Sequence, residues 1–192
     1  MSHGQKSDMR RKLRKLRRSL DDAAVMQATS GIASILAQLP LWQHAHRVAS
    51  YSSCNGEIST ELINIMAQQE GKQLFLPVVG SDNNLSFAVY QPEDAQQINR
   101  FGITEPGASA ERCSVDQLEL ILLPLVAWDR SGARLGMGGG FYDRCLEGVP
   151  EPVRIGLAHS LQEVDHVPSE PWDIKMHYIL TEQELVCCQP PA

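Results

Sequence analysis

Residues 118–144 read LELILLPLVAWDRSGARLGMGGGFYDR and give the clearest sign of how this chain folds. They begin with a run, residues 118–124, that is apolar except for Glu119. A short apolar run without alternation is typical of a strand buried on both faces of a parallel sheet. A turn at residues 129–132, a glycine-rich stretch and a short helix over 141–147 follow. The segment therefore predicts a strand, a ligand-binding loop and a helix, in that order.

Short apolar segments alternate with helical patterns along most of the remaining chain. Helices are expected from an N-cap at Ser19 to about Gln38 and over residues 59–69, and strands over residues 48–52, 73–77, 85–90, 153–159 and 177–181. This alternation predicts a single α/β domain, residues 1–192. We expect a Rossmann-like three-layer sandwich, in which a mostly parallel sheet carries helices on both faces. Residues 91–117 are the least regular and are expected to form a surface excursion over the site.

The N-terminal segment is basic and the body of the chain is acidic. Residues 1–20 hold eight Lys or Arg and one acid, whereas the other residues hold nine basic and 22 acidic side chains, for a net charge of −6. Met9, Leu13, Leu16 and Leu20 recur on one face of a helix, so residues 1–18 are predicted to form a basic helix that packs on the domain. The acidic body would repel a long polyanion, which favours packing over nucleic-acid binding.

Composition excludes several classes of protein. No apolar stretch approaches the ~20 residues that span a bilayer, and no apolar segment follows the charged N-terminus, so neither a membrane anchor nor a secretory signal is expected. Five cysteines without a C-x-x-C pair indicate reduced thiols rather than a zinc site or a redox dithiol. We therefore expect a cytoplasmic protein.

The glycine-rich stretch has the chemistry of a polyphosphate site. Gly136 and Gly138–Gly140 allow backbone N–H groups to approach an anion, because glycine has no Cβ. Arg134 offers a planar fork of donors that suits phosphate, and Asp143 offers a hard oxygen ligand for Mg²⁺. The stretch is neither a Walker A loop nor a G-x-G-x-x-G motif, since Phe141 occupies the final position.

Other carboxylates leave further functions open. Glu57 follows the first predicted strand and Asp173 precedes the last, although a helix start and a turn would explain them equally well. A non-catalytic nucleotide or nucleic-acid binder that uses the basic arm is one alternative. An acyl- or CoA-transfer enzyme is another, with Glu57 or Glu105 as its nucleophile.

Residues 124–144 resemble the signature of the 5-formyltetrahydrofolate cyclo-ligase (methenyltetrahydrofolate synthetase) family. The shared pattern is an apolar-Pro step, Asp-x-x-Gly-x-Arg-Leu-Gly, a glycine-rich step and aromatic-Tyr-Asp. Flanking pieces agree in order, namely the basic helix, Gly56-Glu57-Ile58, Gly102 to Pro106, Gly156 to His159 and Trp172-Asp173-Ile174. The resemblance thus spans nearly the whole chain.

The resemblance implies that MgATP drives ring closure of 5-formyltetrahydrofolate to 5,10-methenyltetrahydrofolate, with release of ADP and phosphate. It implies that Arg134 is catalytic and that ATP contacts Lys6, Arg10, Arg134, Gly136, Met137, Gly138, Gly139, Gly140, Phe141 and Tyr142. The folate would contact Ser52, Glu57, Gly138, Gly139, Gly140 and Phe141, and Asp143 and Asp173 would hold Mg²⁺.

This chain departs from some family members within the glycine step. Met137 and Gly139 stand where those members place a basic residue, so phosphate charge would fall more heavily on Arg134, Lys6 and Arg10. The implied partners are small-molecule substrates only, with no nucleic acid and no membrane, and the implied state is a monomer.

Overall fold

The chain folds around a sheet whose central strand, residues 120–124, is almost entirely buried. The computed structural model describes residues 3–81 and 83–189. Its main sheet runs in the order β12-β11-β10-β7-β1-β2-β3-β6. The strands β11, β10, β7, β1 and β2 are parallel, β12 and β3 run against them, and β6 pairs antiparallel with β3. The strands are β1 (Arg47–Ala49), β2 (Gln73–Val79), β3 (Leu85–Val89), β6 (Arg112–Cys113), β7 (Leu120–Pro124), β10 (Val153–Leu157), β11 (Tyr178–Leu180) and β12 (Leu185–Cys187).

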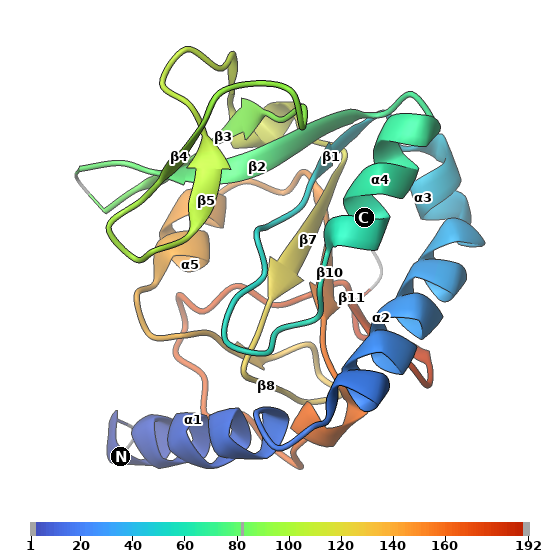
Figure 1. Ribbon diagram of the computed structural model, residues 1–192. Coiled ribbons are helices and arrows are strands. Elements are labelled where there is room, and N and C mark those ends of the chain that lie inside the picture. Colours follow the sequence, from blue (N-terminus) through green and yellow to red (C-terminus); the bar gives the residue numbers. More distant parts are fainter. Residues whose placement is uncertain (1–2, 82, 190–192) are drawn as a thin grey trace.

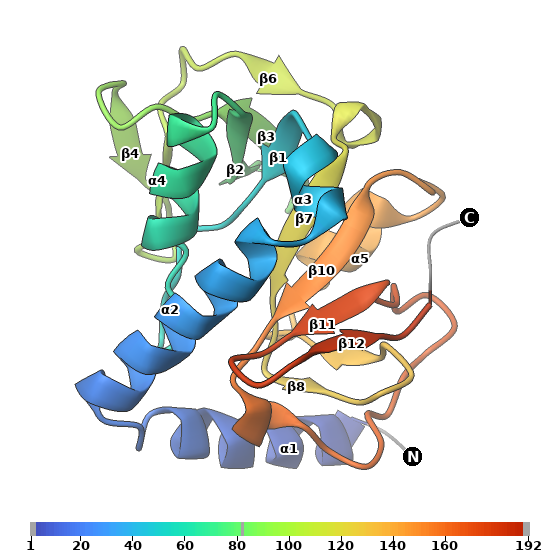
Figure 2. The same ribbon diagram turned by 90° about the vertical axis from the view of Figure 1, so that its right-hand side faces the viewer.

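Helices cover both faces of this sheet, as Figures 1 and 2 show. One face carries α2 (Asp22–Ala37), α3 (Pro40–His44) and α4 (Glu61–Gln69), and the other carries α5 (Phe141–Leu146). Side chains of β7 alternate between the two layers, as the period of a strand requires. Leu120 and Leu122 join the core beneath α2 to α4, whereas Ile121 and Leu123 join the core that includes Leu146 of α5. The predicted three-layer α/β architecture is confirmed.

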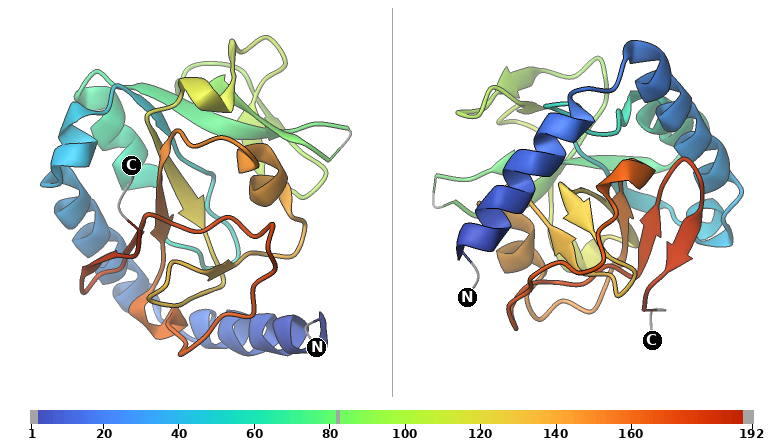
Figure 3. Two further views of the ribbon diagram at one scale, coloured as in Figure 1. Left: turned by 180° about the vertical axis from the view of Figure 1, so that it is seen from behind. Right: turned by 90° about the horizontal axis from the view of Figure 1, so that it is seen from below.

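Helix α1 (His3–Arg17) lies outside these layers, across the carboxyl ends of the parallel strands (Figures 1 and 3). Its Met9 and Leu13 pack on a small hairpin formed by β8 (Ala127–Trp128) and β9 (Arg134–Leu135). The predicted apolar face is only partly right, because Leu16 is exposed and Arg17 is buried in its place. The last turn of α1 meets backbone carbonyls at the strand ends, where a donor side chain fits better than an apolar one.

The start of α2 also differs from the prediction. The N-cap is Asp21, whose carboxylate accepts a hydrogen bond from the N–H of Ala24 at 2.8 Å. The hydroxyl of Ser19, the predicted cap, instead donates to the carbonyl of Leu16 at 2.7 Å. Ser and Asp are both favoured N-cap residues. Because α2 begins at Asp22, Asp21 rather than Ser19 stands directly before its first residue.

That the irregular stretch 91–117 covers the site stays a prediction. The stretch leaves the main sheet after β3 and rejoins it at the edge strand β6. It contains a second hairpin of β4 (Gln96–Ile98) and β5 (Thr104–Pro106), then β6 and a short 3₁₀ turn. Buried Glu105 fixes this hairpin, since its carboxylate accepts from the N–H of Val79 and from the amides of Gln97 and Asn99. All of these contacts are structural, so the geometry gives no support to Glu105 as a nucleophile.

The predicted turn at Asp129–Gly132 is present and requires glycine. The N–H of Gly132 donates to the carbonyl of Asp129 at 3.0 Å, and φ at Gly132 is +81°. A Cβ at this position would lie 2.5 Å from the carbonyl oxygen of Met176. Gly71 has a similar φ of +71°, but a Cβ there would meet nothing within 4 Å.

We expect Gly132→Ala to lower the free energy of unfolding by about 3 kcal/mol, from a left-handed backbone plus a backbone clash. Gly71→Ala has the cost of the left-handed backbone without the clash, so it should lower the free energy of unfolding by only about 1 kcal/mol. Urea unfolding of both variants measures the difference. Equal losses would show that the contact with Met176 relaxes freely.

Candidate active site

The neighbouring strands β1 and β7 mark the point where the strand order of the sheet reverses. From β1 the chain crosses to β2 on one side, whereas β7 and β10 lie on the other. In open α/β sheets, ligands bind outside the carboxyl ends of the strands at such a point. The loop after β1 carries Ser52 and Glu57, and the segment after β7 carries the glycines. The sheet therefore brings these two sequence-predicted groups to one edge.

The glycine stretch is open to solvent and has backbone angles that favour glycine. It joins β9 to α5, and Met137, Gly138 and Gly139 are exposed. Gly138 has φ +103° and Gly140, the residue before α5, has φ +64°. An exposed, glycine-rich bend is the kind of backbone whose N–H groups can bind an anion, and that role of residues 136–140 stays a prediction.

Arg134 and Asp143 form an ion pair beneath this stretch. The guanidinium Nη1 lies 3.1 Å from Oδ1 of Asp143, and the Arg134 side chain is only 4% exposed. The same carboxylate oxygen accepts from the N–H of Ile174 at 3.1 Å. A buried guanidinium with a fixed carboxylate is held in one orientation, which suits a group that must contact a phosphate at a defined place.

Helix α1 delivers two further cations to the same place. Lys6 Nζ lies 2.8 Å from Oδ2 of Asp173. Arg10 Nε donates to the carbonyl of Gly136 at 2.8 Å, and its guanidinium packs beside Gly138. Arg10 thus reaches the glycine stretch and Lys6 reaches Asp173, whereas Arg11 and Lys12 of the same helix are exposed.

Arg17 ties α1 to both strand ends and was not predicted as a functional residue. Its Nε and Nη2 donate to the carbonyl of Asn55 at 3.1 and 2.8 Å, and its Nη1 donates to the carbonyl of Leu125 at 3.1 Å. The spacing of Met9, Leu13 and Arg17, each four residues apart, was the available signal. Because arginine is usually exposed, the sequence alone favours placing Arg17 on the solvent-facing side of the helix rather than in line with Met9 and Leu13.

Glu57 is a buried carboxylate in the loop after β1. Its Oε2 accepts from the N–H of Cys54 at 3.1 Å. Burial raises the pKa of Glu57, while the Cys54 N–H and the charge of Arg17 act in the opposite direction. Burial also raises the pKa of Tyr142, and the charge of Glu57 adds to that effect. The aromatic-Tyr-Asp step and Glu57 therefore share one electrostatic environment.

The remaining predicted substrate residues lie at the rim. Ser52 donates through Oγ to the carbonyl of Thr104 at 2.7 Å, which links the loop after β1 to the β4–β5 hairpin. Phe141 meets Phe101 of that hairpin edge-to-face, with ring centroids 5.7 Å apart. Phe101 directly precedes the Gly102 to Pro106 segment noted in the sequence, but nothing in that segment indicated a contact with Phe141, 40 residues away.

The magnesium role that the sequence suggested for Asp143 and Asp173 stays a prediction. Within the described residues, no group of three or more His, Cys, Asp or Glu side chains is placed to hold a metal. Mg²⁺ often needs only one or two carboxylates, since water and substrate phosphates complete its shell. Both carboxylates are partly exposed, and in the contacts given above each uses one oxygen, Oδ1 of Asp143 and Oδ2 of Asp173.

Comparison with known proteins identifies the family of the chain. A profile of the 5-formyltetrahydrofolate cyclo-ligase family matches residues 2–182. The chain belongs to this family. The resemblance seen in the glycine segment is thus confirmed, and membership places the chain among ligases. In addition, no helix of the described residues has the length and apolar character needed to cross a bilayer.

Individual relatives match over nearly their full length. A protein of Haemophilus influenzae named 5-formyltetrahydrofolate cyclo-ligase is 34% identical, over 94% of this chain and 99% of the relative. The protein of that name from Escherichia coli is also 34% identical, over 90% and 98%. The solved structure of Aquifex aeolicus 5,10-methenyltetrahydrofolate synthetase superimposes with a TM-score of 0.87 at 30% identity, covering 97% of this chain and 94% of that one. A Mycoplasma pneumoniae synthetase, 22% identical with a TM-score of 0.75, shares the fold.

The burial of Glu57 predicts a pH-dependent stability difference. A carboxyl whose pKa is higher in the folded than in the unfolded chain stabilises the fold fully below its unfolded pKa, about 4.3, and that contribution is lost as the pH rises through the raised folded value. Glu57→Gln removes this titration. We therefore expect the unfolding free energy of the variant, relative to the wild type, to increase between about pH 4 and about pH 7.

Denaturant unfolding at the two pH values measures this relative change. Glu61→Gln is the control, because Glu61 is exposed. It shows how much of the pH-dependent change in unfolding free energy comes from removing any carboxylate. If the difference for Glu57→Gln has the same value at both pH values, the carboxyl does not carry the raised pKa.

Proposed function

We propose that this chain uses MgATP to close 5-formyltetrahydrofolate to 5,10-methenyltetrahydrofolate, releasing ADP and phosphate. The observation that carries the proposal is the pairing around the glycine stretch. Arg134 with Asp143 and Lys6 with Asp173 set two cations and two carboxylates beside exposed glycine backbone. Cations and N–H groups suit the phosphates of a nucleotide, and the carboxylates suit the Mg²⁺ that accompanies it.

Positioning and charge neutralisation are what the reaction requires of the protein. The formyl oxygen attacks the γ-phosphorus and ADP leaves. The folate nitrogen N10 then attacks the activated formyl carbon, and phosphate departs with the proton that N10 loses. No step needs a protein nucleophile, which agrees with the structural use of Glu105.

Each proposed residue has one task in this sequence. Arg134, Lys6 and Arg10 neutralise phosphate oxygens, and the backbone of 136–140 orients the γ-phosphate. Asp143 and Asp173 would hold Mg²⁺, which supplies charge neutralisation at the phosphates. Glu57 accepts hydrogen bonds from the donor-rich edge of the pterin, and a desolvated carboxylate forms such charge-assisted bonds strongly.

The decisive experiment follows the methenyl chromophore by absorbance. Purified protein is supplied with 5-formyltetrahydrofolate, ATP and Mg²⁺, with each omitted in turn, and ADP is measured in parallel. The proposal requires product and ADP in equal amounts, and only when all three are present. Folded protein that forms neither would refute it.

In this assay, Lys6→Met should raise the KM for ATP about 10- to 100-fold, because a charged hydrogen bond to phosphate contributes about 1.5–3 kcal/mol. Lys12 is an exposed lysine on the same helix, so Lys12→Met is the matched control and should stay within about twofold. An unchanged KM in Lys6→Met would remove this side chain from the nucleotide site.

Asp143→Asn should shift the Mg²⁺ dependence. The amide keeps an oxygen that can accept from Ile174 but loses the charge that attracts the metal. We expect the Mg²⁺ concentration for half-maximal rate, measured at saturating ATP, to rise about tenfold or more. The exposed Asp94, changed to Asn, is the control. Identical Mg²⁺ curves for both variants would exclude Asp143 as a ligand.

A further inference from the structure

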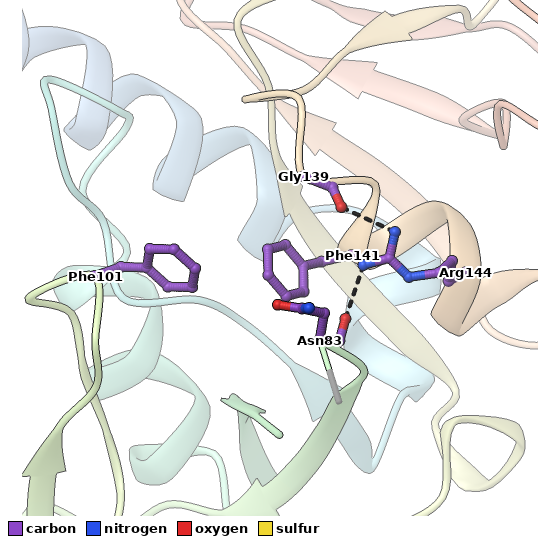
Figure 4. A pocket seen from close by; sticks show the side chains of 5 residues that line it. All are labelled: Asn83, Phe101, Gly139, Phe141 and Arg144. Carbon is purple, nitrogen blue, oxygen red and sulfur yellow. Dashed lines mark hydrogen bonds between the residues drawn. The ribbon is translucent and has the colours of Figure 1, made fainter. Parts of the chain in front are cut away.

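The side chain of Arg144, on α5, joins the glycine stretch to a distant turn of the chain. Its Nη1 donates to the carbonyl of Gly139 at 2.9 Å and its Nη2 donates to the carbonyl of Asn83 at 2.7 Å, as Figure 4 shows. Asn83 lies in the turn between β2 and β3, 61 positions away along the chain. Because the planar fork of an arginine can serve two acceptors at once, one side chain ties the glycine stretch to the main sheet.

The guanidinium of Arg144 lies directly against the backbone of the stretch. A Cβ placed on Gly140 would lie 2.7 Å from Nη1, so this close approach requires a glycine. The guanidinium also lies over the ring of Phe141, 5.4 Å from its centroid. Among the residues that the structure describes, Arg144 forms no ion pair with a carboxylate. Backbone carbonyls are therefore the groups that hold it within this part of the chain.

A hydrogen bond to the carbonyl of Gly139 sets the direction of the next N–H group. Gly139 and Gly140 are joined by a trans peptide bond, in which the C=O and the N–H point in opposite directions. The N–H of Gly140 is therefore directed away from the guanidinium of Arg144. It donates no hydrogen bond to any described residue, so this orientation leaves it free to donate to a ligand.

The glycines make such a constraint necessary. A chain without Cβ atoms has many accessible backbone conformations, and Gly140 itself has φ +64°. At the other end of the stretch, Nε of Arg10 donates to the carbonyl of Gly136 at 2.8 Å, which sets the direction of the Met137 N–H in the same way. Two arginines, Arg10 and Arg144, thus hold the two ends of a segment that would otherwise be flexible.

We propose that Arg144 is a positioning residue, which acts through the carbonyl of Gly139 to hold the N–H of Gly140 toward the γ-phosphate. This inference rests on the proposed function, in which the glycine backbone orients that phosphate. A donor that is oriented before the reaction stabilises the charge that develops in the transition state without any reorganisation. The contribution of Arg144 should therefore appear in kcat rather than in the KM of either substrate.

Arg144→Met tests this role, since it removes the fork but keeps an unbranched stem beside Phe141. We expect kcat to fall about tenfold or more, because losing one oriented N–H donor costs up to about 10²- to 10³-fold in rate. The KM for MgATP and for 5-formyltetrahydrofolate should each stay within about threefold.

Arg112→Met is the matched control. Arg112 is another exposed arginine, whose Nη1 donates to the hydroxyl of Ser86 at 3.2 Å. Its kcat should stay within about twofold of the wild type. Urea unfolding of both variants confirms that each is folded, so a loss of kcat in Arg144→Met alone is not a loss of native protein.

Arg144→Lys separates the hydrogen-bonding fork from the charge. The single ammonium group keeps the positive charge but cannot span two carbonyls, so kcat should stay close to that of Arg144→Met. Full activity of Arg144→Lys would show that charge alone matters and would overturn the positioning role. A raised KM for 5-formyltetrahydrofolate with unchanged kcat in Arg144→Met would also overturn it, because Arg144 would then contact the substrate directly.

Binding of orthovanadate to the complex with MgADP gives a readout that does not need turnover, because vanadate mimics a phosphoryl group in transfer. Calorimetry should show that Arg144→Met lowers the affinity for vanadate about tenfold, while the affinity for MgADP stays within about threefold.

The two measurements distinguish this inference from the proposed function. If the wild type is active but neither kcat nor the vanadate affinity depends on Arg144, the positioning role is refuted and the proposed function stands. Inactive wild type whose vanadate affinity still depends on Arg144 would refute only the proposed function. Inactive wild type without that dependence would refute both.

Discussion

The buried guanidinium of Arg17 is the contact on which the candidate site depends. Burying a charge is costly in free energy unless hydrogen bonds compensate it. Arg17 donates three hydrogen bonds to the carbonyls of Asn55, in the loop after β1, and Leu125, directly after β7. The loop after β1 and the segment after β7 are thereby held to one helix. Since α1 otherwise contributes few apolar contacts, chiefly Met9 and Leu13, this attachment determines where Lys6 and Arg10 stand.

Charge balance explains how so many ionic groups share a small space. Two ion pairs, Arg134 with Asp143 and Lys6 with Asp173, lie in the candidate site. In each pair the cation is proposed to bind phosphate and the carboxylate is proposed to bind the metal. Phosphate would bring negative charge to the cations, and Mg²⁺ would bring positive charge to the carboxylates. Under the proposed function, MgATP would therefore bind without leaving an uncompensated charge in a partly buried place.

The sequence predicted those features that depend on local pattern. The apolar run at β7 gave the central strand, and the glycine segment gave the family, which residues 2–182 confirm. Lys6 and Arg10 came only from the resemblance, and their roles stay predictions. Contacts between distant residues were not predictable from local pattern. Arg17 is buried because of carbonyls 38 and 108 residues away, and Phe101 reaches Phe141 because Glu105 fixes its hairpin.

The ion pair between Lys6 and Asp173 joins residues 167 positions apart, almost the whole length of the chain. During synthesis the lysine emerges from the ribosome long before its partner exists, and closing so large a loop is entropically unfavourable until the sheet has assembled. The N-terminal end of α1 therefore forms this contact with the domain only after the sheet has folded. A nascent chain that has not yet reached residue 173 would present Lys6 without its carboxylate, so this part of the site can form only after Asp173 has been synthesised.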